Sequence, residues 1–232
     1  MGRQDNTLRG RIFWLVAFSI AMGFLEASVV IYLRDLYYPD GFAFPLTFMS
    51  ERNTVVELLR EAATIIMLAG IGVLAGRTPN QRFAFFLASF AVWDIFYYVF
   101  LKLFLHWPGS LLAWDILFLI PVPWIGPVID PIVVSVTMLL LAACLVYRDG
   151  PTRAGRLSIR EWALLITGSV VVVGSWTWEY LRYGFSFSGT TPPINTFVPQ
   201  TYLWPVFWIG EGILLLGIYL YWKRAKPDFP PL

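Results

Sequence analysis

Apolar residues gather in six runs along this chain. Each run is long enough to cross the hydrocarbon core of a bilayer, which takes about 20 helical residues. The runs lie at 12–33, 54–75, 83–104, 128–147, 161–182 and 202–222. The segments between them are short and leave no room for a separate soluble unit. The pattern therefore predicts an all-α polytopic membrane helix bundle of six transmembrane helices, forming a single integral membrane domain over residues 1–232.

A shorter apolar stretch, Leu111–Ile120, lies between the third and fourth runs. It is too short to cross a bilayer, and Pro121, Pro123 and Pro127 follow it and remove helix donors. Irregular backbone is tolerated at membrane depth only where protein or water satisfies its polar groups. We therefore expect a re-entrant or interfacial half-helix at about 110–121, with a seventh, tilted span as the alternative.

The first run follows three arginines, as the apolar part of a signal peptide does. It is too long for that role, contains Glu26 and lacks a clean cleavage site after small residues. We expect a retained membrane helix.

Composition supports a membrane protein. Hydrophobic residues make up 58% of the chain, charged residues 14%, and mean hydropathy is +0.66, whereas soluble domains are about a quarter charged. The single cysteine, Cys144, excludes an intrachain disulfide, and the single histidine, His106, excludes bis-histidine haem and histidine zinc triads within this chain. No cofactor or metal is expected. A net charge of +2 without a basic run gives no sign of nucleic-acid binding. The expected partner is the lipid bilayer, with other membrane proteins or a second copy of the chain as candidates.

The distribution of lysine and arginine predicts the topology. With the N-terminus inside, twelve of the 17 basic residues fall on the inner side: Arg3, Arg9, Arg11, Arg77, Arg82, Arg148, Arg153, Arg156, Arg160, Lys223, Arg224 and Lys226. Arg34, Arg52, Arg60, Lys102 and Arg182 fall on the outer side, and the loop 184–200 carries no charge. The positive-inside rule then places both termini in the cytoplasm, with the protein in the cytoplasmic membrane.

Acidic residues inside the apolar runs are the strongest sign of function. A charged side chain near the bilayer centre costs about 3 kcal/mol on insertion scales, so such residues face the protein interior. We expect a shared polar interior that opens to the outer side. The expected carboxylates are Glu26, Glu57, Glu61, Asp94 and Glu211, and the expected aromatic lining is Trp176, Trp178 and Trp208.

The second run carries Glu57 and Glu61 on one helical face. Two carboxylates one turn apart repel, so they share a proton or hold a cation, unless Arg60 neutralises one of them. The structural alternative is a helix N-terminus stabilised by acids.

Asp94, Tyr98 and Lys102 form a polar stripe on the third run, either a path for protons or solutes or a polar seam between helices. Glu211 lies between two glycines and is either functional or structural. The loop after the first run turns at Pro39-Asp40-Gly41 and continues with apolar residues, as a lid or a membrane anchor does.

Three functions fit these features. The first is binding or transport of a small solute, with an organic cation as one candidate because carboxylates and aromatic rings both attract it. The second is an accessory subunit of a larger membrane complex, such as one linked to redox or quinone chemistry. The third is an intramembrane enzyme with aspartate or glutamate as acid or base. No catalytic residue stands out. The candidates for ligand binding or proton handling are Glu26, Glu57, Arg60, Glu61, Asp94, Tyr98, Lys102, Glu179 and Glu211.

Overall fold

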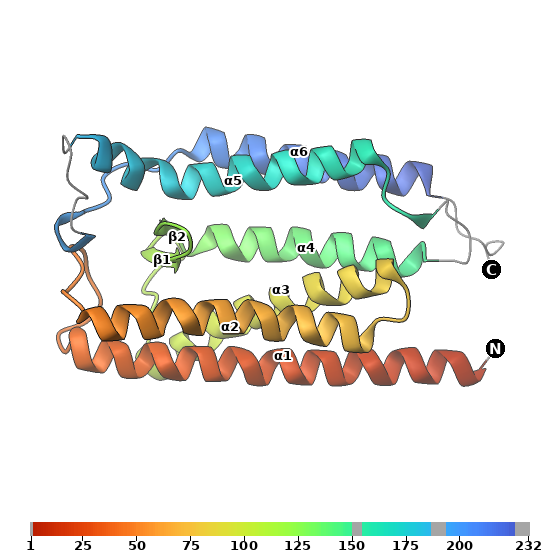
Figure 1. Cartoon of the computed structure of the whole chain (residues 1–232), viewed down its shortest axis with the longest axis horizontal. Coiled ribbons are helices and arrows are strands. Elements are labelled where there is room, and N and C mark those ends of the chain that lie inside the picture. The colour runs from red at the N-terminus through yellow and green to blue at the C-terminus, as the bar shows by residue number, and fades with distance from the viewer. Residues whose placement is uncertain (1, 150–154, 187–193, 226–232) are drawn as a thin grey trace.

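Six long helices run up and down along one axis (Figure 1). The computed structural model describes residues 2–149, 155–186 and 194–225. Within these ranges the helices are α1 (Gly2–Tyr37), α2 (Glu51–Ala75), α3 (Pro79–Leu105), α4 (Ile129–Tyr147), α5 (Ile159–Phe185) and α6 (Trp204–Arg224). A short 3-10 helix, η2 (Ile194–Thr196), lies between α5 and α6. All six helices are long and apolar enough to cross a membrane. The chain is therefore a multi-pass integral membrane protein, and the predicted all-α bundle is confirmed.

Helices α2, α3 and α5 begin where the sequence supplies capping side chains. The Ser50 hydroxyl accepts the Asn53 N–H at the start of α2, and the Thr78 hydroxyl accepts the Gln81 N–H at the start of α3. Ser158 and Glu161 form a reciprocal capping box at the start of α5. These contacts satisfy amide groups that the first turn of a helix leaves free. They explain why α2, α3 and α5 begin before the apolar runs do.

The segment between α3 and α4 is a β-hairpin. Strand β1 (Trp114–Phe118) pairs antiparallel with β2 (Trp124–Pro127), with Ile116 opposite Ile125. The prediction of a half-helix at about 110–121 was therefore wrong, and so was the seventh span, since this segment does not cross the bundle. Aromatic and β-branched residues favour strands, and the first two prolines lie in the connection, where they cost no ladder hydrogen bond.

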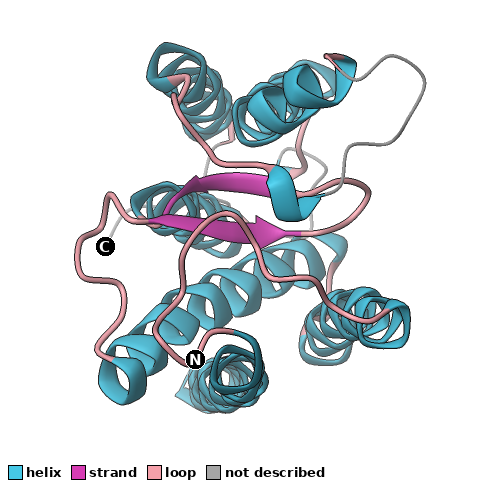
Figure 2. Ribbon diagram, turned by 90° about the vertical axis from the view of Figure 1, so that its left-hand side faces the viewer, coloured by secondary structure: helices cyan, strands magenta, loops and turns pink. Residues whose placement is uncertain are grey.

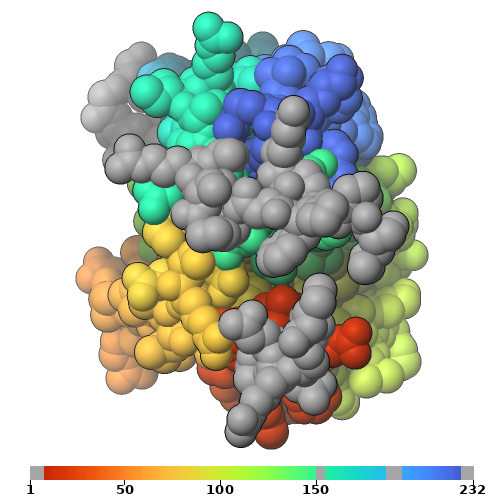
Figure 3. All heavy atoms as spheres, turned by 90° about the vertical axis from the view of Figure 1, so that its right-hand side faces the viewer, coloured from red at the N-terminus to blue at the C-terminus, as the bar shows by residue number. Residues whose placement is uncertain are grey.

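The hairpin lies between two groups of helices. Figure 2 shows it with the α5–α6 pair on one side and α1, α2 and α3 on the other, and α4 continues from β2 between the two groups. We call this the hairpin end of the bundle, where α1, α3 and α5 end and α2, α4 and α6 begin. Figure 3 views the opposite end, where the yellow residues that join α2 to α3 lie beside the red part of α1.

Close backbone contacts hold neighbouring helices together. A Cβ on Gly72 of α2 would lie 2.7 Å from the Phe86 backbone nitrogen and 2.9 Å from the Arg82 carbonyl oxygen of α3. A Cβ on Gly210 of α6 would lie 2.9 Å from the Val172 nitrogen of α5. Small residues permit such approaches between membrane helices. The α2–α3 and α5–α6 pairs therefore depend on these glycines.

Gly72→Ala should lower the melting temperature, because its methyl group meets the α3 backbone. We expect a loss of about 1–3 kcal/mol in the free energy of unfolding, the usual cost of overpacking. Gly70→Ala is the matched control on the same helix, since nothing lies within 4 Å of its Cβ. Thermal unfolding of both variants in detergent checks this. Equal melting temperatures would contradict the proposed packing of α2 on α3.

Candidate functional site

A cavity of about 390 Å³ lies at the hairpin end. Helices α1, α2 and α3, strand β1 and the loop between α1 and α2 line it. Its lining holds five carboxylates and two guanidinium groups: Glu26, Glu57, Glu61, Asp94, Asp115, Arg34 and Arg60. Among the described residues, this charged cavity between apolar helices is the main candidate for a functional site.

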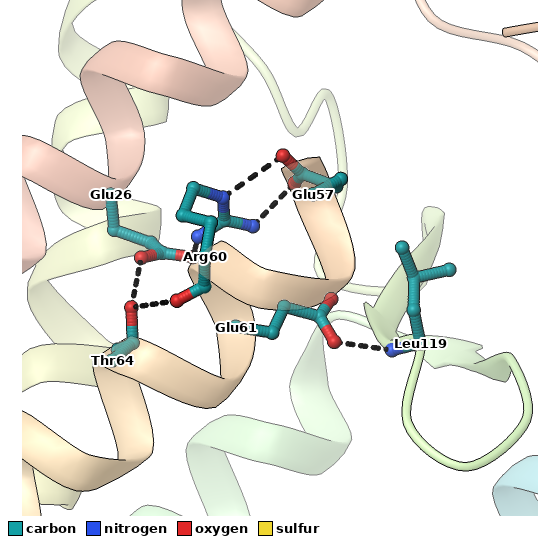
Figure 4. Close-up of polar contacts among 6 residues, drawn as sticks. All are labelled: Glu26, Glu57, Arg60, Glu61, Thr64 and Leu119. Atoms are coloured by element: carbon teal, nitrogen blue, oxygen red, sulfur yellow. Dashed lines mark hydrogen bonds and ion pairs between the residues drawn. The ribbon is translucent and has the colours of Figure 1, made fainter. Parts of the chain in front are cut away.

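Arg60 joins two of the acids. Its guanidinium forms ion pairs with Glu26 of α1 and Glu57 of α2, and its Nε donates to Glu57 Oε2 at 3.0 Å (Figure 4). The Thr64 hydroxyl donates to Glu26 Oε2 at 3.2 Å. One guanidinium thus pairs with two carboxylates. The cluster of Glu26, Glu57 and Arg60 connects α1 to α2.

Glu61 points away from this cluster towards the hairpin. Its Oε2 accepts the Leu119 backbone N–H at 3.0 Å (Figure 4). Glu57 and Glu61 therefore have different partners, although they lie one turn apart. In the part of the chain that the structure describes, Glu61 forms no ion pair within 4 Å. A buried carboxylate that accepts only one amide hydrogen bond is further stabilised by binding a proton or a cation.

Arg34 of α1 and Asp115 of β1 form a second ion pair, at 3.1 Å. The Tyr98 hydroxyl donates to the other Asp115 oxygen at 3.1 Å. The Arg34 guanidinium also lies 3.7 Å from the centre of the Trp107 ring and 4.4 Å from that of Phe42. Burial raises the pKa of Asp115 to about 6, and the Arg34 charge and the Tyr98 hydroxyl oppose this rise. The pair fixes the hairpin to α1 and α3.

Asp94 of α3 lies deeper in the cavity. Its side chain is buried, and its Oδ2 accepts a hydrogen bond from the Ser135 hydroxyl of α4 at 2.8 Å. No ion pair to Asp94 is found within residues 2–149, 155–186 and 194–225. Asp94 also lines a second, smaller cavity. Of the charged cavity's acids, Glu61 and Asp94 are the two that form no ion pair within 4 Å among the described residues.

The loop 38–50 covers the cavity from the hairpin end. Gly41 has φ +104°, and its N–H donates to the Tyr38 carbonyl at 2.9 Å, which gives the expected turn at Pro39-Asp40-Gly41. Phe42, Leu46 and Phe48 from the same loop line the cavity. The loop is thus placed where a lid would lie.

Three of the acids and bases predicted for the site lie elsewhere. Lys102 donates to the carbonyls of His106 and Pro108 at the end of α3, at 3.3 and 2.8 Å. The expected stripe from Asp94 to Lys102 is therefore broken. Glu179 accepts the backbone N–H groups of two residues before α6, and Glu211 is buried against Thr137 of α4 at 2.7 Å. Neither glutamate lines the cavity, so the expected shared interior was wrong for Glu211.

Of the three tryptophans predicted for the aromatic lining, one lines a cavity, but not the charged one. Trp176 is buried, donates to Asp130 Oδ2 at 3.1 Å and lines the second cavity. Trp178 is 51% exposed and Trp208 is 53% exposed, on faces that contact lipid in a membrane. For these two residues the prediction of a cavity lining was wrong.

The sequence interpretation missed the ion pair of Arg34 and Asp115. The two residues are 81 positions apart, and their contact depends on the hairpin that was expected to be a helix. The available signals were Arg34 two turns after Glu26 on one helix, and an acid inside the apolar stretch 111–120. Tyr97, which also lines the cavity, was missed as well.

Comparison of the chain with protein-family models, with curated proteins and with solved structures found no match. The geometry of the cavity is therefore the evidence for function.

Replacing Arg60 should destabilise the protein strongly, because Glu26 and Glu57 lose their cation while remaining buried. We expect Arg60→Met to cost about 3–5 kcal/mol in the free energy of unfolding. Adding Glu26→Gln and Glu57→Gln to this variant should recover most of the loss, since the buried charges are then gone.

Arg52→Met is the matched control, because Arg52 is exposed on the same helix and should change stability by about 0.5 kcal/mol at most. Unfolding in mild detergent at neutral pH compares the variants. If Arg60→Met were as stable as Arg52→Met, the cluster would not hold α1 and α2 together.

Proposed function

We propose that the protein binds or transports a small organic cation, which its charged cavity accommodates between α1, α2, α3 and the hairpin. The observation that carries this proposal is the pair of carboxylates, Glu61 and Asp94, that line the cavity and form no ion pair within 4 Å among the described residues. Two arginines against five acids leave a formal charge of 2 − 5 = −3 when all are ionised. A cationic ligand reduces this excess.

The energetics favour a cation over an anion. Both arginines of the cavity already form ion pairs with its acids. An anion would have to displace a carboxylate from a guanidinium and would meet the remaining negative charges. An ammonium group instead gains charge-assisted hydrogen bonds from free carboxylate oxygens. The charge distribution therefore selects for positive ligands.

The remaining lining suits an organic ion. Trp93, Tyr97 and Phe118 add aromatic rings to the wall, and ring faces attract cations in desolvated sites. The volume of about 390 Å³ falls in the range of small-molecule sites, about 300–1,000 Å³. These features support an amine over a bare metal ion.

We further propose that both termini are cytoplasmic and that the hairpin end faces outward in the cell membrane. Two observations support this orientation. Lysine and arginine concentrate in the segments predicted to be inside. The described parts of these segments lie together at the end of the bundle opposite the hairpin. Arg153 and Lys226, which the count includes, lie outside the described residues. In this orientation the cavity receives its solute from outside the cell. The accessory-subunit and enzyme alternatives stay predictions from the sequence.

Asp94→Asn and Glu61→Gln should each weaken binding of a small amine at least tenfold, because each removes one charge that the ammonium group needs while it keeps the side chain's size. Titration calorimetry with ethylammonium chloride on the purified protein measures this. Glu211→Gln is the control, a buried carboxylate outside the cavity, and should leave affinity unchanged. Unaltered affinity in folded Asp94→Asn and Glu61→Gln protein would refute the proposal.

The orientation is testable by cysteine labelling in a Cys144→Ala background. Asp40 and Arg77 are exposed and lie at opposite ends of the bundle. Asp40→Cys should react with an impermeant maleimide in intact cells, and Arg77→Cys only after permeabilisation. The opposite pattern would reverse the proposed orientation.

A further inference from the structure

A second cavity, of about 190 Å³, lies on the other side of Asp94. It is lined by α3, the hairpin, α4 and α5, and by Leu214 of α6. Apolar side chains dominate its wall, among them Phe90, Val134, Met138, Val173 and Trp124. The first cavity is charged, whereas the second is almost entirely hydrophobic.

The two cavities share part of their walls. Trp93 and Asp94 of α3, and Leu117 and Phe118 of β1, line both. Ser135, whose hydroxyl binds Asp94 Oδ2, lines the second cavity. Asp94 therefore lies at the junction, with the other acids of the site on one side and hydrophobic surface on the other.

Aromatic rings shape the wall of the second cavity near this junction. The Phe118 and Trp124 rings are 5.3 Å apart, and the Trp124 and Trp176 rings are 5.6 Å apart, centre to centre. Apolar protein cavities of about 150 Å³ are large enough to hold a benzene ring. A space of about 190 Å³ with aromatic walls therefore suits one aromatic ring of a ligand.

We propose that the second cavity binds the apolar part of the ligand whose ammonium group lies at Asp94, so that the ligand is an amphipathic amine with a group the size of one aromatic ring. This inference rests on the proposed function and adds the class of ligand. Four residues line both cavities, so the two subsites are adjacent, and the change from charged to apolar lining matches a molecule with one cationic and one hydrophobic end.

The second cavity also reaches the surface of α5. Ser169 lines it and is exposed, and its neighbour Val170 is 64% exposed. Because α5 is apolar and long enough to cross the membrane, this surface contacts lipid. Molecules with an apolar group concentrate in that region, which fits a ligand of the proposed class.

The test compares ethylammonium with 2-phenylethylammonium on the full chain in detergent, by titration calorimetry corrected for partitioning into micelles. The wild-type protein should bind the phenyl compound about ten- to hundredfold more tightly, the gain expected for burying an aromatic side chain. Val173→Phe fills the second cavity and should reduce this ratio to about twofold without changing ethylammonium affinity.

Ser169→Phe is a second filling variant, at the exposed edge of the cavity, and should give the same result where Val173→Phe fails to fold. Val170→Phe adds the same side chain to the lipid-facing side of α5 and should leave both affinities unchanged. A wild-type ratio near one, or a high ratio that survives both filling variants, would overturn the inference.

The outcomes separate the two proposals. If ethylammonium binds in an Asp94-dependent manner and the phenyl group adds nothing, the cation site stands and the second subsite is refuted. If neither amine binds, or if Asp94→Asn binds both as well as the wild type, both proposals fail.

Discussion

The need to compensate buried carboxylates organises the hairpin end of this bundle. A carboxylate among apolar helices is costly unless it is paired, protonated or hydrogen-bonded. Arg60 meets this need for Glu26 and Glu57, and Arg34 meets it for Asp115. The Arg60–Glu57 pair lies within α2, whereas Arg60–Glu26 joins α2 to α1 and Arg34–Asp115 joins α1 to β1. The last two pairs therefore help to position α1, α2 and β1.

The same constraint explains the hairpin. A two-stranded ribbon inside a membrane bundle leaves backbone groups that water does not reach. Glu61 accepts one of them from Leu119, and the ion pair and the Tyr98 hydroxyl hold Asp115 of β1. The hairpin is thereby fixed against α1, α2 and α3, and Leu117 and Phe118 of β1 line both the charged cavity and the apolar one. Glu61 and Asp94 each accept a hydrogen bond but form no ion pair within 4 Å among the described residues, and this is the basis of the proposed cation site.

The six helices were predictable because about 20 apolar residues in a row have few alternatives to a membrane helix. The inward position of Glu26, Glu57, Glu61 and Asp94 followed from the cost of exposing acids to lipid. Glu211 shows the limit of that argument. The cost of exposure predicts that the carboxylate is buried, but it does not predict which side chain the carboxylate contacts. Trp178 and Trp208 show a related limit, because a tryptophan is stable against lipid as well as inside a cavity.

The hairpin and the Arg34–Asp115 pair were not predictable from local pattern. A short apolar stretch bounded by prolines suits a half-helix or a strand, and the choice depends on contacts with α1, α2 and α5. Arg34 lies 81 residues from Asp115, so the contact exists only once the chain has folded. Tertiary packing, rather than local secondary-structure propensity, therefore determines both the hairpin and the Arg34–Asp115 ion pair.

The central claim is that the charged cavity holds a cation between Glu61 and Asp94. An experimental structure of the protein purified from its native membrane, at a resolution that shows bound small molecules, tests this most directly. The account predicts density in the cavity within hydrogen-bonding distance of the Glu61 and Asp94 carboxylates. An anion bound to Arg34 or Arg60 in place of their acids, or a closed cavity in which Glu61 and Asp94 pair with basic side chains of the protein, would contradict it.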